Sequence, residues 1–155
     1  MFVLRDLVEE LQGILEMSED GNTTAWRIGI DPSMSIVADR RQLLRALHNL
    51  CTNALQAGAG AIEVQAGKAD GRIIIDVIDD GPGLPEKARE NLFKAFAGSG
   101  RKGGTGLGLV IVREVAVEHG GDIQLLTTGP GGTTFRLTIP DDIPPHVADM
   151  DAPAA

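Results

Sequence analysis

The 155-residue sequence is poor in cysteine and in aromatic residues: it has one cysteine, one tryptophan, four phenylalanines and no tyrosine. The single Cys51 cannot form an intramolecular disulfide and has no neighbouring cysteine with which to hold a metal, so neither a disulfide scaffold nor a cysteine metal site is expected. Apolar runs are also short, since none approaches the roughly 18 residues that cross a bilayer. These absences predict a soluble, cytoplasmic globular domain, with no direct membrane insertion by this chain.

Basic residues are too few and too scattered for a general nucleic-acid binder. The chain has 14 Lys and Arg against 22 Asp and Glu, which gives a formal net charge of -8. Because binding a phosphate backbone requires a dense basic face, we expect no nucleic-acid partner. The first twelve residues also lack the pattern of a secretory signal, since acidic residues interrupt their apolar positions. Any phosphate that this chain binds must therefore be held locally.

Glycine is the residue in excess. Many of the 20 glycines gather between Gly81 and Gly132, which favours a backbone built around a ligand. Elsewhere, apolar periodicity predicts alternating helices and strands. We expect helices over 2–15, 40–57 and 107–118, a short helix within 84–97, and strands over 25–31, 35–39, 61–67, 71–81, 121–128 and 132–140. Residues 141–155 are rich in Pro, Ala and Asp and are expected to form a disordered tail or linker after a domain over residues 1–140.

The helix expected over 40–57 begins after a good cap, Asp39, and carries two asparagines, Asn49 and Asn53. Residues four apart lie one turn above each other, and this pair falls beside the apolar stripe, at the edge of the buried surface. An amide oxygen there can coordinate a hard cation such as Mg²⁺. Two solvated surface asparagines are the simpler alternative.

A second group of residues follows the most continuously apolar strand, in the sequence "DVIDDGPGL". Asp79 ends the strand, and Gly81 and Gly83 permit a turn on which a flat ligand can lie directly. A carboxylate at this place can accept a hydrogen bond from an exocyclic amine such as that of adenine. The alternative is an ordinary Asp/Gly turn.

The third group is the glycine-rich start of the helix expected over 107–118. Gly104, Gly106 and Gly108 leave backbone N–H groups exposed where the helix dipole favours an anion, so a phosphate is the expected ligand. Arg101 and Lys102 stand just before this stretch and can add positive charge. The spacing matches neither a Walker loop nor a dinucleotide-binding fingerprint.

Taken in order, these pieces resemble one family. "NLCTNA" resembles the N box, "DDGPGL" the G1 box, "LFKAF" the F box and "GTGLGLVIV" the G2 box of the ATP-binding catalytic domain of two-component sensor histidine kinases, within the superfamily of gyrase, Hsp90 and MutL. The resemblance covers the chain from about Phe2 to Pro140. It implies a Bergerat fold, that is, a two-layer α/β sandwich in which a mixed sheet packs against three helices and an ATP lid.

The resemblance also implies roles for individual residues. Asn53 would bind Mg²⁺ with help from Asn49, and Asp79 would read the adenine amino group on a floor shaped by Gly81 and Gly83. Thr133 would contact adenine through water. Phe93 and Phe96 would anchor a lid over roughly 97–103. Further nucleotide contacts would come from Arg101, Lys102, Gly104, Thr105, Gly106, Leu107 and Gly108.

Two departures from related families refine this interpretation. Hydrolysing members and serine-directed kinases usually place a glutamate base where this chain has Asn49, which cannot take a proton at neutral pH, so transfer to a neutral histidine is favoured. Many histidine kinases also carry a basic and an aromatic residue where this chain has Gln56 and Ala57. We expect Lys102 or Arg101 to supply the missing charge at the phosphates, which makes Lys102 a candidate catalytic residue.

The histidines of this chain do not match a phosphorylated one. His48 is expected to pack or be solvated, His119 to be structural at a helix end where a cation suits the dipole, and His146 lies in the tail. The expected activity is therefore γ-phosphoryl transfer from ATP and Mg²⁺ to a histidine on a dimerisation domain outside this chain, with a response regulator as downstream partner. The alternatives are a non-catalytic nucleotide-binding regulatory module and a serine-directed anti-sigma-type kinase. A membrane-anchored parent protein is compatible with this expectation of a cytoplasmic chain.

Overall fold

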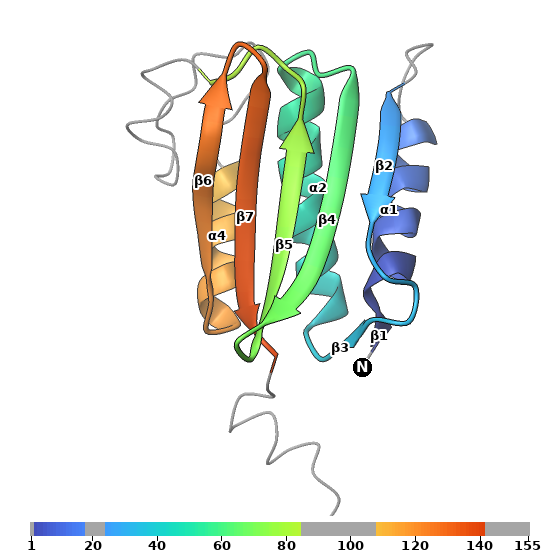
Figure 1. Cartoon of the computed structure of the whole chain (residues 1–155), viewed down its shortest axis with the longest axis vertical. Coiled ribbons are helices and arrows are strands. Elements are labelled where there is room, and N and C mark those ends of the chain that lie inside the picture. The colour runs from blue at the N-terminus through green and yellow to red at the C-terminus, as the bar shows by residue number, and fades with distance from the viewer. Residues whose placement is uncertain (1, 18–23, 85–107, 142–155) are drawn as a thin grey trace, which may run out of the picture.

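The computed structural model describes residues 2–17, 24–84 and 108–141. These residues form three helices and seven strands in alternation (Figure 1), which supports most of the expected elements. The short helix expected within 84–97 lies outside the described residues except for Leu84. The elements are β1 (Phe2–Val3), α1 (Leu4–Met17), β2 (Ala25–Gly29), β3 (Ser35–Ile36), α2 (Arg40–Gln56), β4 (Ala61–Ala69), β5 (Arg72–Asp79), α4 (Gly108–Glu118), β6 (Asp122–Gly129) and β7 (Gly132–Pro140).

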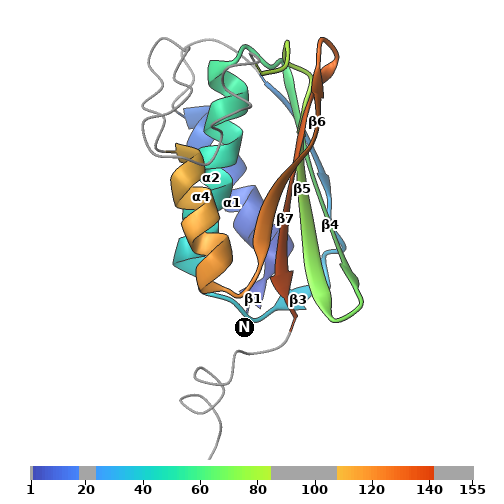
Figure 2. The same cartoon turned by 90° about the vertical axis from the view of Figure 1, so that its left-hand side faces the viewer.

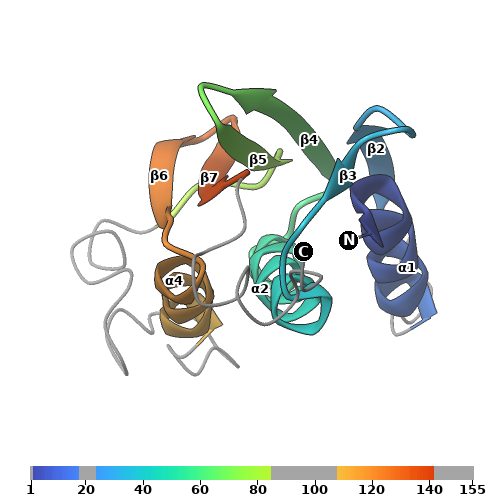
Figure 3. The ribbon, with the colours of Figure 1, turned by 90° about the horizontal axis from the view of Figure 1, so that it is seen from below.

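Five of the strands make one mixed sheet in the order β2-β4-β5-β7-β6. The β2–β4 pair is parallel and the other three pairs are antiparallel. Two hairpins, β4–β5 and β6–β7, therefore supply most of the sheet, and the second closes through the predicted turn between Gly129 and Gly132. The described helices all cover one face of the sheet, as the side view and the view from below show (Figures 2 and 3).

The core lies between the sheet and the helices. Alternate residues of each central strand face it, because successive side chains of a strand point to opposite faces. In β5 these are Ile73, Ile75 and Val77, all at most 2% exposed. The helices contribute Leu4, Leu7, Val8, Leu11, Leu43, Ala46, Leu47, Leu50, Cys51, Ala54, Val112, Val115 and Ala116. The predicted two-layer sandwich of a mixed sheet on three helices is confirmed.

The first helix begins later than its periodicity predicts. Phe2 and Val3 pair with β3 instead, and the helix starts at Leu4, whose N–H donates to Met34 O at 3.1 Å. The strand expected over 25–31 also ends early, at Gly29, because a turn follows in which Met34 N–H donates to Asp31 O. Local propensity could not anticipate this pairing between segments about 30 residues apart.

The edge strand β2 is covered by a side chain from α1. Nη1 of Arg5 donates hydrogen bonds to the carbonyl oxygens of Ile28 at 3.3 Å and Ile30 at 2.8 Å. An open strand edge can pair with another chain, so covering its carbonyls protects the sheet from association at this edge. Nothing in the sequence pattern singled out Arg5 for this role.

At the end of the molecule where α2 begins, two helices are joined by His119. The predicted cap is confirmed, since Asp39 Oδ1 accepts from Gln42 N–H at 3.1 Å. The Asp39 N–H donates to Nε2 of His119 at 3.1 Å, and Nδ1 of the same ring lies 2.7 Å from Val115 O. Nε2 accepts and Nδ1 donates only in the neutral ring. The structural role expected of His119 is therefore supported.

Among the described residues, the helices are too short or too polar for any of them to span a membrane.

Candidate functional site

One row of residues crosses the sheet at the end where β5 stops and β7 starts. In register from edge to edge, it consists of Trp26, Ile62, Asp79, Thr133 and Thr128. Thr133 is only 4% exposed and Ile62 only 1%. Directly opposed side chains on neighbouring strands lie about 4.5–5.5 Å apart at their Cβ atoms, so two predicted site residues, Asp79 and Thr133, are close neighbours.

The side chain of Asp79 lies on the face of the sheet that the helices cover, in phase with Ile75 and Val77. Its Oδ1 accepts a hydrogen bond from Gly81 N–H at 2.8 Å, which holds the carboxylate against the turn that follows. Burial, and after it the charge of Asp79, raise the pKa of the Cys51 thiol to about 12. The carboxylate is therefore near α2, the helix that carries Asn49 and Asn53.

A neighbouring carboxylate, Asp80, ties the turn to the loop after α2. Its Oδ1 accepts hydrogen bonds from Gly60 N–H at 2.8 Å and Ala61 N–H at 2.9 Å. The end of α2 and the end of β5 are thereby held together, which positions Asn53 relative to Asp79. The sequence pattern did not predict this role of Asp80, although the doubled aspartate of "DDGPGL" was a visible signal.

The turn after β5 lies directly on the β6–β7 hairpin, at two glycines. Gly83 has a φ of +89°, and a Cβ there would come within 2.5 Å of Gly129 O. Gly132 has a φ of +136°, and a Cβ there would collide with Asp79 O. Gly83 thus has the positive φ that a glycine permits and packs on the backbone of the hairpin, whereas Gly81 is absent from the positive-φ residues of the described chain.

A hydroxyl of β6 completes this junction. Oγ1 of Thr128 accepts a hydrogen bond from Leu84 N–H at 2.8 Å and lies 2.9 Å from Oγ1 of Thr133. One side chain thus joins the residue after the turn to the buried threonine opposite Asp79. The sequence pattern did not single out Thr128, because its importance depends on a pairing between β6 and β7 and on a loop 44 residues away.

Asn49 and Asn53 lie where the helical spacing predicts. Both are half-buried beside the buried stripe of α2, which includes Leu50 and Ala54. No group of three or more His, Cys, Asp or Glu side chains able to hold a metal occurs among the described residues. A cation at this site would therefore depend on amide oxygens and on oxygens of the ligand itself, which is the coordination that Mg²⁺ commonly adopts.

Several predicted contacts lie outside the described residues. These are the lid over 97–103, Phe93, Phe96, Arg101, Lys102, Gly104, Thr105, Gly106 and Leu107. His146, which was given no contact, also lies outside them. Gly108 is described as the first residue of α4. The N-terminus of α4 is at the same end of the molecule as the end of α2 (Figure 1).

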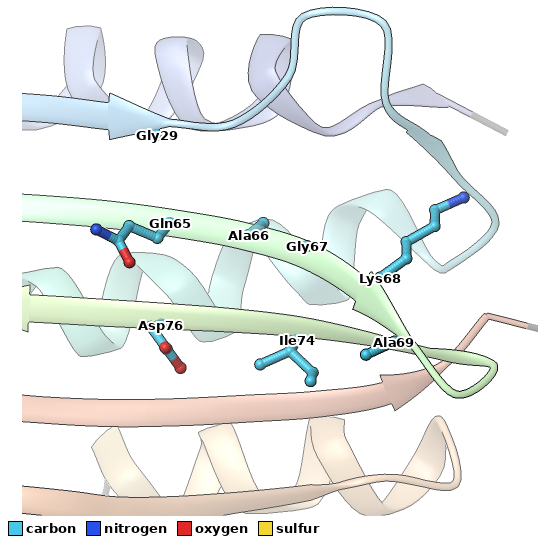
Figure 4. Close-up of a pocket in the computed structure, with 8 residues that line it drawn as sticks. All are labelled: Gly29, Gln65, Ala66, Gly67, Lys68, Ala69, Ile74 and Asp76. Carbon is cyan, nitrogen blue, oxygen red and sulfur yellow. The ribbon is translucent and has the colours of Figure 1, made fainter.

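Two hollows lie elsewhere. One, of about 350 Å³, is on the outer face of the sheet, where Gln65, Ile74 and Asp76 point away from the helices (Figure 4). The other, of about 540 Å³, lies between α1 and α2 and is lined by Ile14, Arg41, Gln42, Leu44, Arg45 and His48. Neither contains Asn53, Asp79 or Thr133, so both are distinct from the predicted site.

Comparisons with known proteins agree with the geometry. Residues 38–143 match the family described as histidine kinase-, DNA gyrase B-, and HSP90-like ATPase. The C4-dicarboxylate transport sensor protein DctB of Rhizobium meliloti is 36% identical over 88% of this chain and 22% of its own length. The signal transduction histidine-protein kinase AfsQ2 of Streptomyces coelicolor is 42% identical over 82% of this chain and 25% of its own length. The chain thus spans a quarter or less of these two relatives.

The fold is similar to that of solved histidine kinase structures. The catalytic domain of histidine kinase ThkA, in a nucleotide-free form, superposes with a TM-score of 0.78 at 28% identity, covering 90% of this chain and 95% of that one. Full-length ShkA in complex with AMPPNP superposes with a TM-score of 0.75 at 29% identity, covering 90% of this chain and 30% of that one. The resemblance seen in the sequence is confirmed by both comparisons.

Proposed function

This chain belongs to the histidine kinase-, DNA gyrase B-, and HSP90-like ATPase family and has the fold of a histidine kinase catalytic domain, and from this we propose that it binds ATP with Mg²⁺ and transfers the γ-phosphoryl group to a histidine of another domain. The recipient is a dimerisation domain outside this chain, and a response regulator receives the phosphoryl group next. The domain covers residues 1–140 and is cytoplasmic, and residues 141–155 are a tail or linker.

The observation that carries the proposal is the environment of Asp79. Its carboxylate is half-buried on the helix side of the sheet, is held by Gly81 N–H, and stands opposite Thr133. A carboxylate accepts hydrogen bonds but donates none, so it selects a ligand that presents an amine. The turn through Gly81 and Gly83, directly after Asp79, would carry the backbone past a flat ring. These features fit adenine.

The phosphates would lie between the second half of α2 and the N-terminus of α4. Asn53, assisted by Asn49, would hold Mg²⁺, which supplies charge neutralisation at the phosphates when it is bound. Lys102 or Arg101 would add a cation, and the backbone from Gly104 to Gly108 would donate N–H groups. The contribution of this chain is positioning and charge rather than covalent chemistry.

Asn49 favours histidine as the recipient. Transfer breaks the bond between the γ-phosphorus and its bridging oxygen, forms a bond from that phosphorus to a ring nitrogen, and releases ADP. A hydroxyl or water must lose a proton on attack, whereas a neutral ring nitrogen attacks with its lone pair. An amide at Asn49 cannot serve as the proton acceptor that a hydroxyl requires.

The first experiment is calorimetric titration of ATP and ADP into the 155-residue chain, with and without Mg²⁺. We expect micromolar affinity, which Asp79→Asn lowers at least tenfold because a charge-assisted hydrogen bond is lost, at about 1.5–3 kcal/mol. Asp76→Asn is the matched control, since Asp76 is in the same strand but faces outward to Arg136. Absence of ATP binding to the unsubstituted chain would contradict the proposal.

A second experiment separates the kinase from a non-catalytic nucleotide-binding module. The chain is incubated with labelled ATP and a separately prepared histidine-bearing hairpin domain. Acid-labile phosphate on the hairpin supports the kinase, and acid-stable phosphate on a serine substrate would favour the serine-directed alternative. ATP binding without transfer to either substrate would favour the regulatory module.

A further inference from the structure

The hydroxyl of Thr128 connects three segments that surround Asp79. It accepts from Leu84 N–H at 2.8 Å and contacts the Thr133 hydroxyl at 2.9 Å. Gly83 packs on Gly129 and Gly132 packs on Asp79 O in the same junction, and both of these contacts are steric. The contact between the Thr128 and Thr133 hydroxyls differs from these two, because it is a hydrogen bond and either hydroxyl can be its donor.

The Thr128–Thr133 contact carries one proton, which either hydroxyl can supply. Accepting from Leu84 N–H polarises the Thr128 hydroxyl and makes it the better donor of the two. The negative charge of Asp79, opposite Thr133 in register, favours the Thr133 proton pointing toward the site. Both effects select the same arrangement, in which Thr128 donates to Thr133 and the Thr133 proton is left for a ligand.

We propose that Thr128 is a positioning residue for base selection, which orients the Thr133 hydroxyl as a donor beside the Asp79 acceptor. The edge of a 6-aminopurine presents an amine beside an unprotonated ring nitrogen. The Asp79 carboxylate would accept from the amine and the Thr133 hydroxyl would donate to the ring nitrogen, directly or through one water. A 6-oxopurine presents the reverse, an oxygen beside a ring N–H. This inference rests on the proposed nucleotide binding at Asp79 and deepens it by assigning selectivity to a residue that need not touch the base.

Three triphosphates separate this role from that of Asp79. ATP offers the amine and the ring acceptor, purine riboside triphosphate offers only the ring acceptor, and inosine triphosphate offers neither. Thr128→Val should weaken ATP and purine riboside triphosphate about tenfold each, since one oriented hydrogen bond is lost, and should leave inosine triphosphate within about twofold. Asp79→Asn should weaken ATP without weakening purine riboside triphosphate.

The controls use the same hairpin. Thr128→Ser keeps the hydroxyl and should restore the selectivity, and Thr127→Val makes the same change at the exposed neighbouring residue and should alter no affinity. Thr128→Ala, which adds no methyl group, serves if the valine variant does not fold. Trp26, the single tryptophan of the chain, lies in the same cross-strand row. Its fluorescence emission monitors the folding of each variant.

Each outcome is decisive. Equal weakening of all three triphosphates would show that Thr128 only supports the structure, and unchanged affinities would show that it has no role, so either result overturns the inference. If ATP binding depends on Asp79 while Thr128→Val retains full selectivity, the proposed function stands and this inference fails. Absence of ATP binding in the unsubstituted chain would overturn the proposed function and this inference with it.

Discussion

The two ends of this sandwich are held together by different means. At the end where α2 begins, side chains satisfy the backbone groups of helix termini. Asp39 caps α2, and His119 joins this cap residue to the last turn of α4. At the end where α2 finishes, backbone segments lie on one another at Gly83 and Gly132, and polar side chains join them. The first arrangement resembles ordinary helix capping, whereas the second shapes a surface.

This difference indicates which end contributes stability and which contributes function. Polar groups that satisfy each other and helix termini lower the free energy of the folded chain without presenting anything to a ligand. Glycines with positive φ cost conformational entropy and are retained where a side chain would block an approach. The second end also holds Asp79 and the buried Thr133, so its geometry is organised around them.

The strongest test of the comparison is Gly132→Ala. The new Cβ would collide with Asp79 O, and the φ of +136° strains any L side chain, so we expect the free energy of unfolding to fall by about 2–4 kcal/mol, with loss of ATP binding. Denaturant titration measures the first effect and calorimetry the second.

Gly131→Ala is the matched control, because a Cβ at this neighbouring exposed glycine meets nothing within 4 Å. Its stability should stay within about 0.5 kcal/mol of the unsubstituted chain. Equal effects of the two substitutions would contradict the steric account of the hairpin.

A smaller effect is expected at the opposite end, from His119→Ala. The variant loses the bond from Asp39 N–H and the bond to Val115 O, so the free energy of unfolding should fall by about 1–2 kcal/mol. ATP affinity should stay within about twofold if this end serves stability alone. Glu118→Ala, at the exposed preceding residue, controls for the loss of a side chain. A large loss of ATP affinity in His119→Ala would break the distinction between the two ends.

The smallest effect is a pH dependence that sharpens the description of the site end. The pKa of Cys51 rises from its ordinary 9.0 to about 12 on folding, so above pH 9 the unfolded chain releases a proton that the folded chain keeps. Stability from this residue is complete below pH 9 and is lost as pH rises toward 12, by about 1 kcal/mol at pH 10. Denaturation at pH 8 and 10 measures it, and Cys51→Ala should remove this part of the slope. An unchanged slope would place the thiol outside the buried region.

Much of the fold could be predicted from the sequence because the relevant signals are local. The periodicity of α2, the Asp39 cap and the turn between Gly129 and Gly132 all depend on residues within a few positions of each other. The half-buried place of Asn49 and Asn53 follows from the same helical period. The order of the motifs carried the resemblance to histidine kinase catalytic domains, and the comparisons confirmed that family and fold.

The missed features connect residues distant in the chain. Arg5 covers carbonyls 23 and 25 residues away, and Asp80 binds N–H groups 20 and 19 residues away. The helix dipole at His119 was visible in the sequence, whereas the contact of this ring with the Asp39 N–H, 80 residues away, was not. In each case the local pattern predicted the helix or strand that carries the residue, but it could not predict the distant hydrogen-bond partner of its side chain.

The sequence alone determined most of the segments that become helices and strands, and it marked Asp79 as the end of a buried strand, because these properties arise from short-range periodicity and backbone preference. Tertiary structure alone decided that Thr133 stands opposite Asp79 and that Thr128 links it to Leu84. Strand register and the meeting of loops are set by packing of the whole core, since a shift of one residue would turn every buried side chain of a strand to the other face.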